Sequence, residues 1–347
     1  GFAGSLAVVG RIAEAATALG RALQRGLRSP GLLHVVTMLP ADAIDLDLLG
    51  AVDRLAAVRS SADADEKNTL EFLRAAALDR AGRHDEAWRT LVAANRPLAA
   101  KYQAELKLDI ARRERALARM RAMSPVAARR DENSPIPLFI LGPSRSGKTT
   151  LERLIGAAWA GIKTGHEAPI VEKALRRTFQ AAAIPASGNL DELPTELLPV
   201  FRDNYREEAL RRAASMPVLT GTPPTRMVDA GILSAALPNV RFLLVKRDVE
   251  DVTWRIYMTK YATANPYAYD LKEIRDYVGW YNAMIDLMAE KLPHTTRVVS
   301  YEDMVAQPGA VLRMAGGLCD LPPVADAPPP GDDRGCAAPY MKFLRGS

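Results

Sequence analysis

The segment LFILGPSRSGKTTLE, from Leu138 to Glu152, places the strongest constraint on what this chain can fold into. It joins an apolar run of strand length to a helix-like run through the pattern G-x-x-x-x-G-K-[ST], with Gly142, Gly147 and Lys148 at fixed positions. A strand, a glycine loop and a helix form an anion site, because free N–H groups at the helix start point at the ligand. The segment therefore predicts a phosphate site in an α/β fold.

Further apolar runs of strand length follow along the chain, with helix-like runs between them. This alternation predicts an α/β fold, a P-loop-like parallel sheet with helices on both faces. Ligands of such sheets bind at the carboxyl ends of the strands. The four predicted strands are Pro137–Gly142, Met216–Gly221, Val240–Arg247 and Thr296–Tyr301.

Residues 1–125 have a different pattern, rich in Ala, Leu and Arg and poor in Gly, which predicts an all-helical region. Within it, Phe72–Leu98 resembles a tetratricopeptide hairpin, with two helical runs flanking a turn at Gly82. A plain helical hairpin and a partner- or acceptor-binding module both remain open. A polar stretch then predicts a linker at 126–135, followed by the α/β domain at 136–347.

The composition narrows the class of protein. An apolar content of 48% with 25% charged residues is typical of a soluble globular chain. The net charge of +5 is spread along the chain, so it fits an anionic ligand and predicts no nucleic-acid partner. The cysteines, Cys319 and Cys336, form neither a disulfide framework nor a metal motif. No run reaches the roughly 18 apolar residues of a membrane span, and we predict a cytoplasmic protein.

The loop pattern by itself does not name the ligand. An ATP or GTP enzyme should also hold Mg²⁺ through an aspartate of a second strand. The run VRFLLV ends in Lys246 and Arg247 before Asp248 arrives, and Asp229 is not preceded by a convincing strand. Two cations at a strand end suit a second phosphate better than a metal, so we expect no metal site.

Five segments, in this order, make residues 70–340 similar to the sulfotransferase superfamily. The closest resemblance is to bacterial sulfotransferases with an N-terminal tetratricopeptide region, and tyrosylprotein sulfotransferases share the site plan. The resemblance implies an enzyme that transfers a sulfuryl group from 3′-phosphoadenosine 5′-phosphosulfate (PAPS) to an acceptor hydroxyl or amine. The product is 3′-phosphoadenosine 5′-phosphate (PAP). The segments are RSGKTTLE, GHEAPIV, LPNVRFLLVKRDVEDV, YAYDLKEI and SYEDMVAQPGAVLR.

The resemblance also implies where the donor binds. The 3′-phosphate is assigned to Arg247, and Arg255 replaces a serine that usually joins it. Tyr301 corresponds to a tyrosine that lies near the adenine in relatives. The loop residues expected to hold the 5′-phosphosulfate are Ser144, Arg145, Ser146, Gly147, Lys148, Thr149 and Thr150.

The same resemblance implies the catalytic groups. Glu167 falls on the glutamate base of tyrosylprotein sulfotransferases, with its neighbour His166 as the alternative, and Arg145 supplies positive charge. A lysine that usually precedes a proline is replaced by Thr222. We hypothesise that Lys148, unusual in the loop, supplies the missing charge.

Two other functions remain open. The loop lysine alone favours a P-loop kinase or NTPase, and a non-catalytic scaffold would bind nucleotide and act through the helical repeat. The acceptor is not readable: a peptide, small molecule, lipid or glycan all fit, with possible protein contact through the helical region.

Overall fold

The structure, a computed structural model, describes residues 2–8, 10–59, 63–124, 134–185, 188–262, 265–324 and 327–345. Most of the predicted linker at 126–135 lies outside the described residues.

Compactness divides the chain into two units. The helical unit comprises residues 1–107, 253–275 and 335–347, and the sheet unit comprises residues 108–252 and 276–334. Two later segments are thus grouped with the N-terminal helices, and the division into 1–125 and 136–347 stays a prediction.

A five-stranded sheet forms the centre of the sheet unit, with strand order β2-β3-β1-β4-β5 and every neighbouring pair parallel. The predicted parallel sheet is confirmed, and each of the four predicted strands is present within two residues of its expected ends. The two-residue β2 was not predicted, because so short a strand has no periodicity of its own. The strands are β1 (Ile136–Leu141), β2 (Ile162–Lys163), β3 (Val218–Gly221), β4 (Arg241–Lys246) and β5 (Thr296–Ser300).

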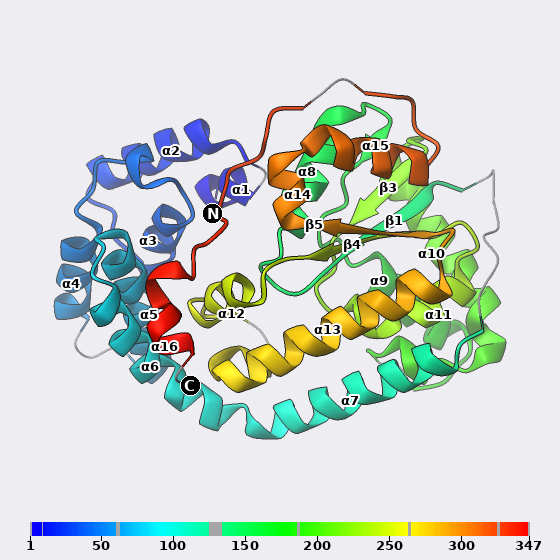
Figure 1. The fold of residues 1–347 in the computed structure, drawn as a ribbon, viewed down its shortest axis with the longest axis horizontal. Coiled ribbons are helices and arrows are strands. Elements are labelled where there is room, and N and C mark those ends of the chain that lie inside the picture. The colour runs from blue at the N-terminus through cyan, green and yellow to red at the C-terminus, as the bar shows by residue number, and fades with distance from the viewer. Residues whose placement is uncertain are drawn as a thin grey trace. The chain divides into compact units, whose positions relative to one another are not determined.

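Alternate side chains of β1 face opposite sides of the sheet, as the strand period of two requires. Leu138 and Ile140 are buried in a core cluster with Leu151 of α8. Phe139 packs on the other side, with its ring centroid 6.0 Å from Phe242 and 6.4 Å from Tyr205 of α10. Both faces are therefore covered: α8, α14 and α15 lie over one, and α9, α10 and α11 over the other (Figure 1).

The bounds of the helices in the sheet unit are α8 (Lys148–Ala158), α9 (Ile170–Ala181), α10 (Leu198–Ala213), α11 (Ala230–Ala236), α14 (Tyr301–Ala306) and α15 (Pro308–Leu318). Three short 3-10 helices add η2 (Leu190–Glu192), η3 (Thr195–Leu197) and η4 (Arg226–Asp229). Three helices contribute residues to both units, namely α7 (Gln103–Ala122), α12 (Val249–Tyr257) and α13 (Leu271–Lys291).

The helical unit has its own apolar core, which includes Leu19, Leu33, Val52 and Leu73. Its helices are α1 (Phe2–Val8), α2 (Ile12–Gln24), α3 (Pro30–Thr37), α4 (Leu48–Val58), α5 (Ala64–Arg80), α6 (His84–Lys101) and α16 (Met341–Leu344). Its 3-10 helices are η1 (Ala41–Ala43), η5 (Pro266–Tyr269) and η6 (Ala338–Tyr340).

Helices α5 and α6 form the predicted hairpin. The side chain of Asp63 caps the start of α5 by accepting from the N–H of Glu66 at 2.8 Å. Gly82 lies in the turn with φ of +71°, a conformation that glycine adopts without steric cost. The hairpin is present, and its designation as a tetratricopeptide repeat stays a prediction.

The two later segments of the helical unit meet this hairpin through aromatic rings. Trp88 of α6 stacks on Phe343 at 4.8 Å between centroids and on Trp254 at 6.2 Å. Trp254 in turn stacks on Tyr340, whose hydroxyl donates to Asp79 of α5 at 2.5 Å. We call these four rings the aromatic cluster; it joins three chain segments into one unit.

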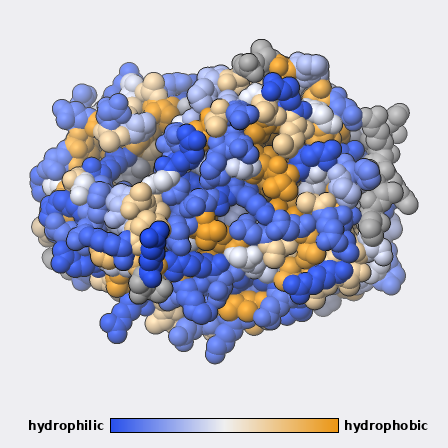
Figure 2. Space-filling view, in the orientation of Figure 1, coloured by the Kyte–Doolittle hydropathy of each residue, from blue (hydrophilic) through white to orange (hydrophobic). Residues whose placement is uncertain are grey.

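Hydrophilic side chains cover most of the face drawn in Figure 2, with apolar ones in small groups between them. Among the described helices, none combines the length and the apolarity that crossing a membrane requires.

Candidate active site

The predicted strand, glycine loop and helix are present where β1 ends and α8 begins. Gly147 is the N-cap of α8 with φ of +98°, a left-handed conformation that favours glycine. A Cβ there would lie 2.5 Å from the Tyr301 ring, and a Cβ at Gly142 would lie 2.7 Å from the carbonyl oxygen of Val245. Close packing therefore requires both pattern glycines, and the left-handed conformation is a second requirement at Gly147.

The loop offers a buried hydroxyl and helix-start N–H groups that have no side-chain partner among the described residues. The Ser146 hydroxyl is buried and has no hydrogen-bond partner among the described residues. No side chain caps the start of α8, so its first N–H groups lack the usual side-chain acceptor. Arg145 is exposed and has φ of +64°, an uncommon conformation for a residue with a side chain. These features suit a bound anion.

Lys148 is buried, and its side chain turns back onto the loop. Its Nζ donates to the carbonyl oxygens of Gly142 at 2.9 Å and Pro143 at 2.7 Å. Burial lowers the pKa of Lys148 to about 8, an effect that Glu167 opposes and Arg145 adds to. Among the described residues, the hydrogen-bond acceptors of this cation are thus neutral carbonyls.

Arg247 follows β4, the neighbour of β1, and lies against the loop. Its Nη1 donates to the carbonyl oxygen of Arg145 at 3.2 Å. The guanidinium lies over the ring of Tyr301, 4.2 Å from its centroid, and its side chain is 3% exposed. Arg145, Arg247 and Tyr301 therefore meet at the carboxyl ends of adjacent parallel strands. The sequence analysis assigned all three to the nucleotide donor.

A model of the Sulfotransferase family matches residues 137–326, more than half of the chain. The chain belongs to the sulfotransferase family.

The solved structures to which this chain is similar include two sulfotransferases whose sequence identity to it is low. One from Alicyclobacillus acidocaldarius is 14% identical, covers 61% of this chain and 92% of its own, and has a TM-score of 0.38. The sulfotransferase domain of the Synechococcus PCC 7002 olefin synthase is 21% identical, covers 60% and 82%, and has a TM-score of 0.37.

A curated relative, an uncharacterised protein of Aquifex aeolicus (strain VF5), is 23% identical over 202 residues, 56% of this chain. The chain spans about a quarter of the length of that relative, since the match covers 26% of it.

The sequence analysis did not predict one buried carboxylate of the sheet unit. Glu152 of α8 is fully buried and accepts from the His166 backbone N–H at 3.0 Å and from the Thr220 hydroxyl at 2.5 Å. Its other oxygen lies 2.8 Å from His166 Nδ1. The available signal was an acidic residue one helical turn after Lys148, on the same face as the apolar Ile155.

His166 is fixed by its backbone as well as by Glu152. It has φ of +52°, and its carbonyl oxygen accepts from the N–H of Thr222 at 2.8 Å. Its side chain is half-buried, whereas the adjacent Glu167 is exposed. The two candidate bases are therefore neighbours in different settings, one held rigidly by a buried carboxylate and one at the surface near Lys148.

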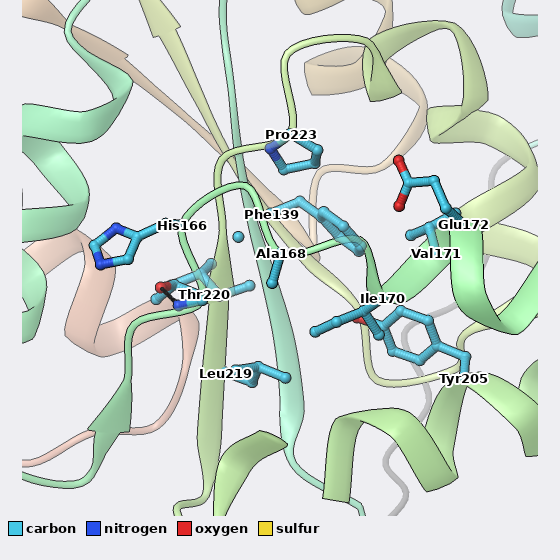
Figure 3. Close-up of a pocket in the computed structure, with 13 residues that line it drawn as sticks. Phe139, His166, Ala168, Ile170, Val171, Glu172, Tyr205, Leu219, Thr220 and Pro223 are labelled. Carbon is cyan, nitrogen blue, oxygen red and sulfur yellow. Dashed lines mark hydrogen bonds between the residues drawn. The ribbon is translucent and has the colours of Figure 1, made fainter. Parts of the chain in front are cut away.

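A small pocket borders His166 (Figure 3). Its cavity of about 20 Å³ has room for about one water molecule, too little for an acceptor. The imidazole of His166 points away from the apolar side chains Phe139, Ile170 and Tyr205 that line the pocket's other side (Figure 3).

The remaining predicted residues are placed as follows. Ser144, Thr149 and Thr150 are half-buried on the loop and the first turn of α8. Thr222, at the position of the missing lysine, is buried. Arg255 lies in the last turn of α12, in the part that belongs to the helical unit, so it is not among the residues that the sheet unit brings together.

Asp229, considered above as a possible metal ligand, forms ion pairs within the sheet unit. It is buried and pairs with Arg226 at 2.5 Å and with Arg112 at 3.4 Å. In the part of the chain that the structure describes, no group of three or more His, Cys, Asp or Glu side chains is arranged to hold a metal ion.

Proposed function

We propose that this member of the sulfotransferase family transfers the sulfuryl group of PAPS to an acceptor hydroxyl or amine by in-line transfer. The observation that carries the proposal is the meeting of the glycine loop, Arg247 and Tyr301 at adjacent strand ends. Two anion-binding elements so close together suit the two phosphate-bearing ends of one nucleotide.

The residues present fit this donor. The buried Ser146 hydroxyl, the start of α8 and the cations Arg145 and Lys148 suit the 5′-phosphosulfate. Thr149 and Thr150 add hydroxyls. When bound, the donor supplies an activated sulfuryl group whose transfer leaves PAP.

Lys148 has the role of stabilising the charge that builds up on the leaving phosphate. A buried ammonium in a low-dielectric site does this more strongly than an exposed one. The position of the usual lysine holds the uncharged, buried Thr222, so Lys148 is the proposed replacement. Arg145, exposed at the loop, adds positive charge.

Glu167 is the proposed base that takes the acceptor proton. Its exposure leaves it accessible to an acceptor, and its charge acts on Lys148. His166 is the second candidate, because Glu152 holds its Nδ1 and thereby orients the ring. If Glu167 is the base, Glu167→Gln lowers kcat by about 10²-fold or more and His166→Gln has a smaller effect. The opposite order would assign the base to His166.

A P-loop kinase or NTPase is the rival function, favoured by Lys148. Calorimetry with PAP against ATP–Mg²⁺ separates the two. We expect PAP to bind more tightly, and Arg247→Ala to weaken PAP while leaving ATP–Mg²⁺ unchanged. Tighter binding of ATP–Mg²⁺ would overturn the proposal.

A non-catalytic scaffold would bind nucleotide without turnover. Incubation with PAPS and a mixture of phenols, peptides, lipids and glycans tests this possibility, with PAP release as the measurement. Release that depends on the mixture is expected of an enzyme, and no release above the blank is expected of a scaffold. Protein acceptors or partners are proposed to contact the helical unit, and a cytoplasmic location is part of the same proposal.

A further inference from the structure

The guanidinium of Arg247 already binds a carboxylate of its own chain. Its Nη2 donates to the backbone oxygen of Asp333 at 2.5 Å and lies 3.2 Å from Oδ2 of the same residue. Oδ2 of Asp251 also lies 3.6 Å from Nη2 of Arg247. All three residues belong to the sheet unit.

The backbone of the segment Gly331–Arg334 places Asp333, and not its neighbour Asp332, beside Arg247. The backbone N–H of Asp333 donates to the Tyr301 hydroxyl at 3.2 Å, and that hydroxyl donates to the carbonyl oxygen of Gly331 at 3.4 Å. Asp332 instead accepts from the Arg334 side chain at 2.9 and 2.8 Å. Two adjacent acids thus have separate partners.

Carboxylate and phosphate oxygens bind a guanidinium in the same way, through charge-assisted hydrogen bonds. Arg247 carries one positive charge, and the two carboxylates beside it carry two negative charges when ionised. A phosphate that approached this group would meet repulsion from both acids. The phosphate would also find Nη2 of Arg247 bonded to Asp333. Because the Asp333 side chain is 36% exposed, it is the acid that the phosphate would displace.

We propose that Asp333 is a specificity-determining residue whose carboxylate occupies the place on Arg247 that a 3′-phosphate would take. The inference rests on the proposed function, which assigns the 3′-phosphate of the donor to Arg247. Asp333 lowers the affinity for nucleotides with a 3′-phosphate, and it leaves nucleotides without one unaffected. The ratio of the affinities for these two classes of nucleotide is therefore smaller than it would be if Arg247 had no Asp333 beside it.

The test compares PAP with adenosine 5′-monophosphate (AMP), which lacks the 3′-phosphate, by calorimetry on the full chain. The variants are Asp333→Asn and Asp333→Ala, with Asp332→Asn as the matched control. We expect both Asp333 variants to bind PAP about tenfold more tightly, with AMP affinity changed less than about twofold. Asp332→Asn should leave both affinities within about twofold of the original protein.

The outcomes separate this inference from the function on which it rests. PAP affinity that is unchanged or weakened in both Asp333 variants overturns the inference and leaves the sulfotransferase proposal intact. An equal gain for AMP also overturns it, since the effect would then not depend on the 3′-phosphate. If no protein in the set binds PAP, the proposed donor is wrong and the inference fails with it. A thermal unfolding scan confirms that each variant is folded.

Discussion

The two buried cations of the site, Lys148 and Arg247, lie in opposite electrostatic settings. Lys148 donates to the neutral carbonyls of Gly142 and Pro143, whereas Arg247 faces the carboxylate of Asp333. The hydrogen-bond acceptors of Lys148 among the described residues are neutral; burial lowers its pKa, and the nearby charge of Glu167 opposes that shift. A carboxylate compensates the charge and occupies the donors. Burial alone therefore does not make a cation available to bind an anion. Its availability also depends on whether its hydrogen-bond partners are neutral or negatively charged.

The largest expected effect comes from removing the cation of Lys148. Lys148→Thr should lower kcat by about 10²- to 10³-fold, as loss of a group that stabilises transition-state charge does. The double variant with Thr222→Lys should retain more turnover, because it returns a cation to the usual position. PAP release from PAPS measures both. Equal inactivity of the two variants would show that the charge was not relocated.

Glu152 and Asp333 allow a second comparison, between a fully buried carboxylate and a partly exposed one at the proposed 3′-phosphate site. Glu152→Ala leaves the His166 N–H and the Thr220 hydroxyl without their acceptor, and should lower the free energy of unfolding by about 2–4 kcal/mol. Urea unfolding at equilibrium measures this change. Glu152→Gln, which keeps an acceptor oxygen, should lose less; a loss below about 1 kcal/mol in the alanine variant would contradict the buried role.

The pH dependence of binding sharpens the contrast between the two cations. The pKa of Lys148 is about 8, below its ordinary 10.5, so the free protein loses this positive charge as pH rises through about 8. PAP affinity should then fall by up to about tenfold per pH unit. Lys148→Arg keeps the charge and should abolish the fall between pH 7 and 9.5. Calorimetry across that range is the measurement, and an identical fall in the arginine variant would assign it to another group.

The smallest expected effect is on stability at the Arg247 end. Asp333→Ala should change the free energy of unfolding by less than about 1 kcal/mol, because water reaches the partly exposed Asp333 end and Asp251 still pairs with Arg247 Nη2. Urea unfolding beside Glu152→Ala tests this directly. A loss as large as that of Glu152→Ala would mean that Asp333 serves the fold and not ligand selection.

The parallel sheet and the glycine loop were predictable because their signals are local. Strand-length apolar runs and the glycine spacing each lie within a few residues of sequence, and so does the cation at the end of β4. The meeting of Arg247 with the loop followed from the rule that parallel strands share one carboxyl edge.

What the sequence did not reveal depends on contacts between distant residues. Glu152 meets Thr220, 68 positions away, and Asp333 meets Arg247, 86 positions away. Neither pairing leaves a periodic pattern. The adjacent acids Asp332 and Asp333 in a proline-rich loop were visible, but which of them turns toward the arginine depends on the Tyr301 hydroxyl.

The aromatic cluster has a practical consequence for shortening this chain. A fragment limited to the family segment, residues 137–326, would keep Trp254 but lose Trp88 and Tyr340, the two rings that stack on it. An indole now 1% exposed would face water, and such surfaces promote aggregation. Expression trials should therefore retain both ends of the chain, and poor yield of the shorter piece would say nothing about catalysis.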